Sequence, residues 1–168
     1  VSSAASAPPG LEKTEMKRWW ILLGIAVMAC LLSPFQGTDV GKLRPAQWVY
    51  LSRDGETVLV RTDLGDLGKG GGVGEALGDL MESAPGALFL DTADYILVSP
   101  ECADLLPNMG GWVRGAAEVY VTAAPPDEET GAFLEAHRGK TLLRDCMLGT
   151  QALSGLTRDG ERWILIDG

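Results

Sequence analysis

A glycine-rich run at residues 63–74 is the first stretch whose composition could do chemistry. Backbone amides that precede a helix can hold a phosphate group. The spacing fits neither the P-loop pattern nor the dinucleotide-binding Gly-x-Gly-x-x-Gly pattern, because Glu75 stands where the third glycine would follow Gly70 and Gly72. Lys69 is the only basic residue in the run. The run therefore predicts a turning connection rather than a nucleotide site.

The single histidine, His137, would need Ser154 or Asp145 as a partner to serve in acid–base chemistry. A lone histidine on a helix face is more often packed or solvated than catalytic. Asp91 and Asp94 flank a break between two apolar runs and could bind a cation, but two carboxylates alone make a weak site. We therefore predict a protein that is not an enzyme, with no catalytic residue, cofactor or metal.

The three cysteines are Cys30, Cys102 and Cys146. None lies in a CxxC motif, and one histidine cannot complete a usual zinc ligand set. Cys30 is the candidate for lipidation. In that case Cys102 and Cys146 are left as a pair that could form a disulfide outside the cell, although such cysteines are more often small buried apolar residues.

The chain contains one strongly apolar segment, residues 19–32, which follows the cations Lys17 and Arg18. A membrane-spanning helix needs roughly 20 apolar residues, and a run of about 14 is typical of a signal peptide. Residues 27–30, Val-Met-Ala-Cys, resemble a bacterial lipobox, in which the cysteine is acylated and becomes the mature N-terminus. An uncleaved transmembrane anchor is the alternative, and a buried core helix is the least favoured because the run has no polar face.

The charge distribution supports an extracytoplasmic location. The chain carries a net charge of −9, and residues 1–29 hold three cations and two carboxylates, so the remainder carries −10. An acidic domain repels phosphate backbones and anionic lipid, so we predict no nucleic-acid partner and expect membrane attachment to come from the anchor. Lys17 and Arg18 are expected to stay on the cytoplasmic side of the membrane, which places the domain that follows on the extracytoplasmic side.

The predicted domain organisation has four parts. Residues 1–15 are a Ser/Ala/Pro-rich extension that we expect to be disordered, and Met16 stands where a signal peptide would start, so our hypothesis is that Met16 is the true initiator and that residues 1–15 are not translated. Residues 16–32 are the signal peptide or anchor, 33–45 a tether, and 46–168 one globular domain.

In the globular domain, Asp-Gly turns predict two β-hairpins, over residues 46–62 and 156–166. Between them we expect a helix from about 73 to 84, apolar strands at 87–90 and 95–98, a helix from Pro100 disturbed by Pro107, a strand at 117–122, a helix from Pro125, and a further β run from Thr141. Trp48, Trp112 and Trp163 should pack in or beside the core, or one of them on a partner surface. The predicted fold class is α/β (mixed α+β): one mixed sheet with about three covering helices and flanking hairpins.

Over residues 47–123 the chain resembles a known family. A Gly68-Lys69-Gly70 loop leads to a helix beginning with Glu75-Ala76 and then to residues 88–98, LFLDTADYILV. This order resembles the N-terminal domain of the C subunit of bacterial spore germinant receptors, the Ger(x)C lipoproteins, in which "LFLGHADVLVI"-like sequence follows the helix. The Gly-His of the family is replaced here by Asp91-Thr92, and Leu31-Leu32 follow Cys30 where the family has Trp and a polar residue. The resemblance implies a non-enzymatic receptor or scaffold component on the outer face of the membrane and carries over no catalytic residue.

The sequence thus predicts a membrane-anchored extracytoplasmic protein that works by protein–protein interaction with membrane partners. An anchored domain that binds a small ligand is the second hypothesis, and a hydrolase that uses His137 is the third.

Overall fold

The computed structural model describes residues 19–24, 28, 43–149 and 152–166. The chain divides into two units, Val1–Thr38 and Asp39–Gly168. In the first unit, residues 19–24 are helical and their large apolar side chains are exposed. Within the described ranges, no helix is both long and apolar enough to cross a membrane. Met16, Cys30 and most of the predicted signal or anchor lie outside the described residues, so the anchor remains a prediction.

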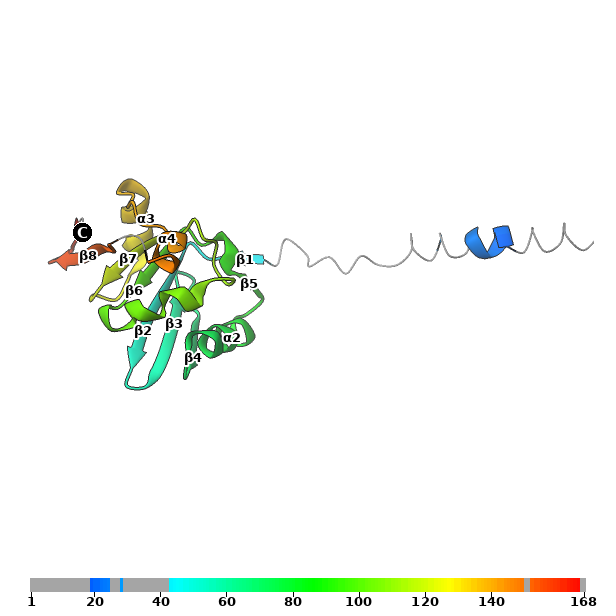
Figure 1. Ribbon diagram of the computed structural model, residues 1–168, viewed down its shortest axis with the longest axis horizontal. Helices are drawn as coiled ribbons and strands as arrows, with labels where there is room; N and C mark the ends of the chain where they lie inside the picture. The colour runs from blue at the N-terminus through cyan, green and yellow to red at the C-terminus, as the bar shows by residue number, and fades with distance from the viewer. Residues whose placement is uncertain (1–18, 25–27, 29–42, 150–151, 167–168) are drawn as a thin grey trace, which may run out of the picture. The chain divides into compact units, whose positions relative to one another are not determined.

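The second unit is built on a seven-stranded mixed sheet with the strand order β4-β3-β2-β6-β7-β8-β9, shown in Figure 1. The strands are β2 (Trp48–Asp54), β3 (Thr57–Thr62), β4 (Leu67–Gly70), β6 (Tyr95–Val98), β7 (Glu118–Thr122), β8 (Ser154–Asp159) and β9 (Arg162–Ile166). Strands β2, β6, β7 and β8 run parallel, and β3 and β9 pair antiparallel with β2 and β8. A separate parallel pair joins β1 (Leu43–Pro45) to β5 (Ala87–Phe89). The predicted mixed α/β class is confirmed.

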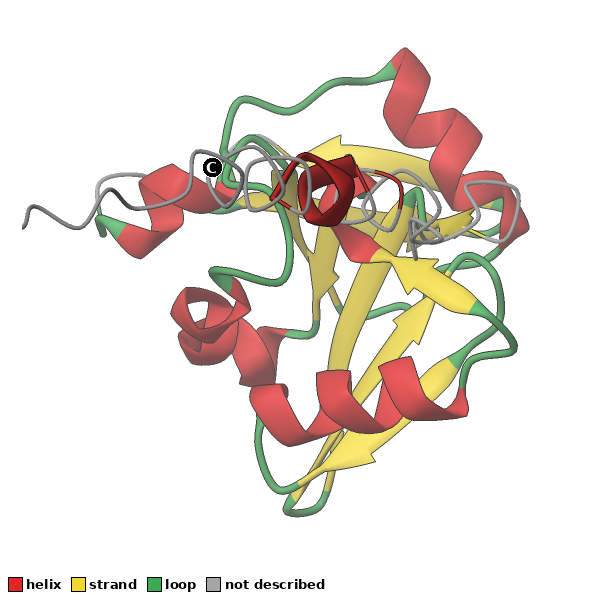
Figure 2. Ribbon diagram, turned by 90° about the vertical axis from the view of Figure 1, so that its right-hand side faces the viewer, coloured by secondary structure: helices red, strands yellow, loops and turns green. Residues whose placement is uncertain are grey.

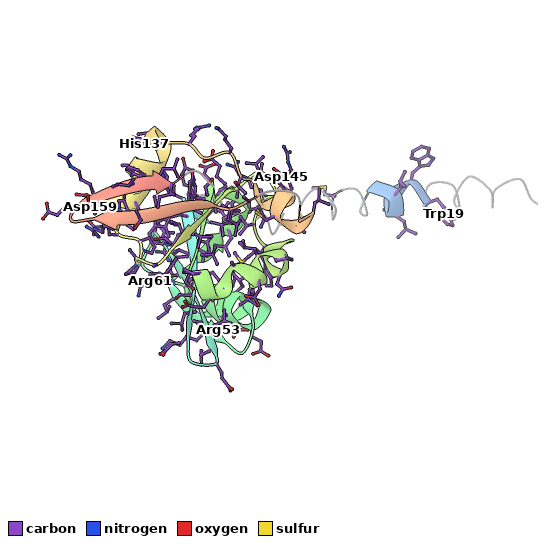
Figure 3. The ribbon with its side chains drawn as sticks, turned by 60° about the vertical axis from the view of Figure 1, so that its left-hand side comes forward. Trp19, Arg53, Arg61, His137, Asp145 and Asp159 are labelled. Carbon is purple, nitrogen blue, oxygen red and sulfur yellow. The ribbon has the colours of Figure 1, made fainter. Side chains whose placement is uncertain are left out.

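Both Asp-Gly hairpins form where the sequence predicts them. Gly55 joins β2 to β3 and Gly160 joins β8 to β9, each with φ of 61°, a left-handed conformation that glycine adopts without steric cost. The β8–β9 hairpin, with Asp159 close to its turn, is visible in Figure 3.

The sheet has two differently covered faces, because successive strand residues point to opposite sides. Val49 and Leu51 of β2 pack into a cluster with helix α2 (Val73–Ser83) and the 3₁₀ helix η3 (Pro100–Met109). This side, which also receives Leu143 of the short helix α4 (Leu143–Met147), is called the α2 face. Trp48 and Tyr50 point the other way, into a cluster that includes Leu134 of helix α3 (Glu128–Ala136), and this side is called the α3 face.

The predicted glycine-rich connection contains a strand that the sequence analysis did not anticipate. Residues 67–70 form β4, which lies against α2 (Figure 2). A Cβ atom on Gly68 would collide with the Ala76 carbonyl and lie 2.6 Å from the Leu80 Cβ, and one on Gly70 would lie 2.5 Å from the Ala76 nitrogen. The two glycines therefore serve close strand–helix packing.

Four further expectations are corrected or refined. Leu143 begins helix α4 instead of continuing a β run from Thr141, because β8 pairs with β7 and leaves room only for a single bridge between Leu142 and Glu118. The helix that begins at Pro100 is 3₁₀ rather than α, with Pro107 inside it. The break after Leu88-Phe89 is the single 3₁₀ turn η2 (Leu90–Thr92). Residues 43–45, placed by sequence in the tether, form β1.

Candidate functional site

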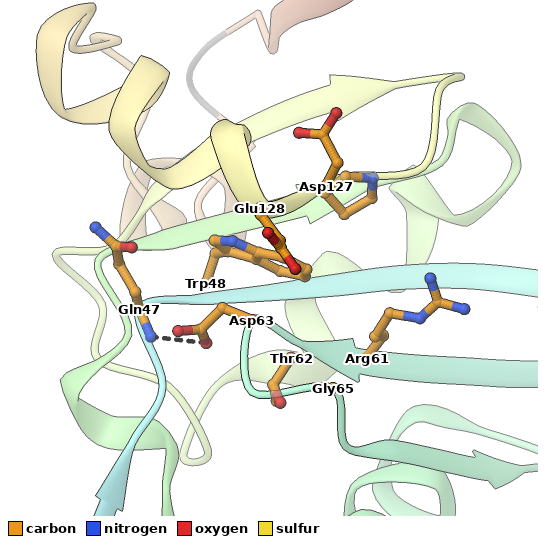
Figure 4. Close-up of a pocket in the computed structure, with 9 residues that line it drawn as sticks. Gln47, Trp48, Arg61, Thr62, Asp63, Gly65, Asp127 and Glu128 are labelled. Carbon is orange, nitrogen blue, oxygen red and sulfur yellow. Dashed lines mark hydrogen bonds between the residues drawn. The ribbon is translucent and has the colours of Figure 1, made fainter.

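A groove of about 370 Å³ lies between the start of β2, the end of β3 and the first turn of α3 (Figure 4). Two segments that are more than 60 residues apart in the sequence form its walls. The residues that line it are Gln47, Trp48, Arg61, Thr62, Asp63, Gly65, Pro126, Asp127 and Glu128. Its volume is in the range of sites that hold small molecules or single side chains, roughly 300–1,000 Å³.

The lower wall of the groove is held by Asp63. The Asp63 carboxylate accepts a hydrogen bond of 3.0 Å from the backbone N–H of Gln47, which ties the turn after β3 to the start of β2. Gly65, with φ of 83°, allows this turn to reverse before β4. Burial raises the pKa of Asp63 above its usual range, although the backbone N–H groups of Gln47 and Trp48 oppose that shift. Asp63 is therefore a structural residue at the rim.

The upper wall is the N-terminus of α3, which Asp127 caps. Its carboxylate accepts from the N–H groups of Glu129 and Thr130, at 3.2 and 3.1 Å, and from the Trp163 indole N–H at 3.3 Å. Arg158 completes the set with a 2.7 Å ion pair. Burial alone would raise the pKa of Asp127, but the hydrogen bonds from the Thr130 hydroxyl, the Trp163 indole and the Glu129 N–H, together with the Arg158 guanidinium, outweigh it and lower the pKa. Asp127 is thus committed to joining α3 to β8 and β9.

Two charges of opposite sign at the groove have no such structural task. Arg61 and Glu128 are both exposed, and the side chain of neither forms a salt bridge or a hydrogen bond with another described residue. Figure 4 shows the side chains of Glu128, Trp48 and Arg61 around the groove that they line. Trp48 itself is 5% exposed and forms the apolar floor.

Beside the groove, the α3 face of the sheet is exposed at Arg61 and Leu67. Arg61 stands opposite Tyr50 on β2 and opposite Leu67 on β4, and Leu59 lies two residues before it on the same side of β3. Leu67 is 37% exposed and Leu59 is half-buried. The groove therefore continues into an open patch formed by Leu59, Arg61 and Leu67, beside the buried Tyr50.

A second hollow of about 310 Å³ lies between α3 and β9, lined by Glu129, Phe133, Glu161, Arg162 and Trp163. The Arg158 guanidinium lies 5.5 Å from the centre of the Trp163 ring, a cation–π contact that stiffens this side of the molecule. Of the three tryptophans in the globular domain, Trp48 and Trp163 are buried in the cluster on the α3 face, whereas Trp112 is 37% exposed.

The structure does not assemble His137, Ser154 and Asp145 into a catalytic group. His137 ends α3, stacks on Phe133 with ring centroids 4.3 Å apart, and its Nδ1 lies 3.0 Å from the Phe133 carbonyl oxygen. Ser154 Oγ is 3.4 Å from Thr141 Oγ1, and Asp145 lies on α4 beside Arg144. His137 and Asp145 stand on different elements in Figure 3.

The remaining candidates have structural environments of their own. Asp94 pairs with Arg114, and Asp91 lies exposed in η2. No set of three or more metal-binding side chains occurs among the described residues. Cys102 is buried and Cys146 half-buried, both as free thiols, and burial raises the pKa of the Cys146 thiol. Cys30, the lipidation candidate, lies outside the described residues.

Sequence reasoning missed the groove itself. Arg61 and Glu128 are 67 positions apart and carry no motif, and only the crossing of α3 over the start of β2 brings their segments together. The one available signal was Arg61 in the hairpin strand, a cation at a position that alternation places on the same side as Leu59.

Comparisons with protein-family models, with curated proteins and with solved structures give no match to this chain.

Proposed function

We propose that this chain is a membrane-anchored, extracytoplasmic, non-enzymatic interaction protein that holds a partner protein at the groove beside Arg61 and Glu128. Residues 19–32, or a lipid on Cys30, provide the anchor in this proposal, and Lys17 and Arg18 place the domain on the extracytoplasmic side. A relationship to germinant receptor C subunits remains a hypothesis that rests on the residues 47–123 alone.

The observation that carries the proposal is that two charged side chains without partners among the described residues, Arg61 and Glu128, line a groove next to an open patch. Asp63 and Asp127 in the same groove are both fixed by hydrogen bonds to backbone N–H groups, so they stabilise the fold. The side chains of Arg61 and Glu128 form no such hydrogen bond, and Arg61 stands opposite the exposed Leu67 of β4. Charged side chains around an apolar centre are the usual arrangement of a protein-binding surface.

Site-specific photocrosslinking in cells that make the full chain tests this proposal. A photoreactive residue at Leu59, on the open patch, should give discrete crosslinked products with a membrane protein. The same residue at Arg53 is the matched control, because Arg53 is exposed on the neighbouring strand but points to the α2 face. Equal crosslinking at both positions, or none at Leu59, would contradict the assignment.

A small-ligand site is the second candidate, and the volume and the opposed charges of the groove favour it. A dipolar molecule could place its anionic end at Arg61 and its cationic end at Glu128. The full chain would then melt at a higher temperature in the presence of the ligand, by RT ln(1 + [L]/Kd). A ligand-dependent rise that Arg61→Gln removes, without crosslinks at Leu59, would favour this candidate over the first.

A further inference from the structure

The second hollow, of about 310 Å³ between α3 and β9, is a site separate from the groove. The first turn of α3 contributes to both, because Glu128 lines the groove and the next residue, Glu129, lines the hollow. Among the described residues, the two share no lining residue. The hollow is lined by Glu129, Phe133, Glu161, Arg162 and Trp163.

The two aromatic rings of the hollow are held by contacts of their own. Trp163 is 6% exposed, and its indole N–H donates to Asp127 at 3.3 Å. Phe133 stacks on His137 with ring centroids 4.3 Å apart. The Arg158 guanidinium, which is paired with Asp127, lies 5.5 Å from the centre of the Trp163 ring, so this indole already has one guanidinium beside it. Rings held in this way lose little conformational freedom when a ligand binds.

Two carboxylates give the hollow its charge. Glu129 and Glu161 are both exposed, and the side chain of neither forms a hydrogen bond or an ion pair with another described residue. Arg162 also lines the hollow, but its neighbour Trp163 packs on the α3 face, so alternation along β9 directs the Arg162 side chain to the other face. The hollow therefore combines aromatic walls with a local excess of negative charge.

We propose that this hollow binds an arginine side chain of a partner polypeptide. A guanidinium group stacks on aromatic rings, is more weakly hydrated than an ammonium group, and has five N–H donors in one plane. One carboxylate from α3 and one from the β8–β9 turn can therefore both accept hydrogen bonds from it. The net charge of −9 attracts a cation in the same direction, and a volume at the lower end of ligand sites suits a single side chain.

Only the source of the arginine, a protein partner, rests on the proposed function. Recognition of the guanidinium depends on the hollow and not on Arg61 or the groove. Photocrosslinking at Leu59 and binding of arginine at the hollow therefore test two separate surfaces, and either result can fail while the other holds.

NMR titration of the full chain in detergent tests the hollow with two probes of the same shape. The probes are arginine and citrulline, each with an acetylated amino group and an amidated carboxyl group, and citrulline replaces the guanidinium with a neutral urea. We expect the arginine probe to shift the indole N–H resonance of Trp163 and the citrulline probe to bind several-fold more weakly. Trp48, in the groove, is the internal control. Trp48→Phe and Trp163→Phe each remove one resonance and so assign both.

Three variants locate the attraction. Glu129→Gln and Glu161→Gln should each weaken binding of the arginine probe by up to about fivefold, the range of an exposed ion pair. Asp159→Asn is the matched control: Asp159 is exposed in the same hairpin but stands opposite Arg162, on the other face of the sheet. This variant removes one negative charge from the same hairpin and should leave the affinity unchanged.

A Trp163 shift that requires the guanidinium and both glutamates supports the proposal. Equal binding of the citrulline probe, or a shift confined to Trp48, would overturn it. Equal weakening by Asp159→Asn and Glu161→Gln would also overturn it, because net charge alone would then explain the attraction. Free arginine that binds many-fold more tightly than the capped probe would contradict a polypeptide source and indicate a small-molecule site instead.

Discussion

Replacement of Gly68 by alanine should destabilise the fold, whereas the same replacement at Gly78, ten residues later, should not. A methyl group on Gly68 meets the Ala76 carbonyl and lies 2.6 Å from both the Leu80 Cβ and the Leu80 nitrogen, so β4 and α2 must separate to admit it. Overpacking of a buried contact typically costs about 1–3 kcal/mol, and the upper end applies here because the obstacle is main chain.

Alanine at Gly78 of helix α2 should change the stability in the opposite direction. A Cβ atom there meets nothing within 4 Å, and Gly78 lies in the interior of α2. Alanine is favoured over glycine in a helix by about 1 kcal/mol, so Gly78→Ala should stabilise the protein. At about 4 °C per kcal/mol for a domain of this size, the two variants should melt about 15 °C apart.

Thermal unfolding of the full chain in detergent, followed by circular dichroism, measures this difference. The expected result is a melting temperature below wild type for Gly68→Ala and slightly above it for Gly78→Ala. The reasoning would be refuted if Gly68→Ala melted at or above the wild-type temperature. In that case the glycines of β4 would not serve strand–helix packing, and a ligand-binding role for the glycine-rich run would have to be reconsidered.

Three further predictions concern the anchor, the cap and a buried hydroxyl. Cys30→Ala should abolish processing and acyl labelling if the chain is a lipoprotein and leave an uncleaved anchor unaffected, which metabolic labelling with a fatty acid distinguishes. Because folding lowers the pKa of Asp127, the ionised carboxylate stabilises the protein fully above the unfolded-state pKa of about 3.9, and this stabilisation is lost as the pH falls through the folded-state pKa. The melting temperatures of wild type and Asp127→Asn should therefore converge below about pH 4. A difference in melting temperature that stays constant with pH would exclude this linkage. Tyr120→Phe removes a hydroxyl that donates to Glu118 at 2.6 Å and accepts from the Gly139 N–H, so urea unfolding should show a loss of about 1–3 kcal/mol, whereas Tyr95→Phe, whose hydroxyl bonds to no described residue, should lose less.

The parts of the fold that the sequence predicted are those set by local chemistry. The Asp-Gly turns at Gly55 and Gly160 require left-handed glycine, and the pattern of Val73, Leu77 and Leu80 marks the buried side of α2. Met81, which follows Leu80 and has the spacing of the same stripe, is 41% exposed, because the buried stripe passes through Ala76 instead. The local spacing of apolar residues thus predicts that a helix forms, but it predicts only approximately which side of that helix is buried.

The features that the sequence did not predict depend on long-range contacts. Strand β4 was missed because glycine has low β-propensity, and only its neighbour α2 explains why two glycines are needed. The short helix α4 was missed because the pairing of β8 with β7 restricts Leu142 to a single bridge. The groove was missed for the same reason, since Arg61 and Glu128 come to line one groove only after the chain folds α3 over the start of β2.

The most direct test of the proposed function is the effect of Arg61→Glu on crosslinking from a photoreactive residue at Leu59. Arg53→Glu is the control, because it makes the same charge change on an exposed strand residue that faces the opposite side of the sheet. We expect Arg61→Glu to remove the crosslinked partner and Arg53→Glu to retain it. Crosslinking that survives Arg61→Glu, or that both substitutions reduce equally, would contradict the proposal that this groove binds the partner.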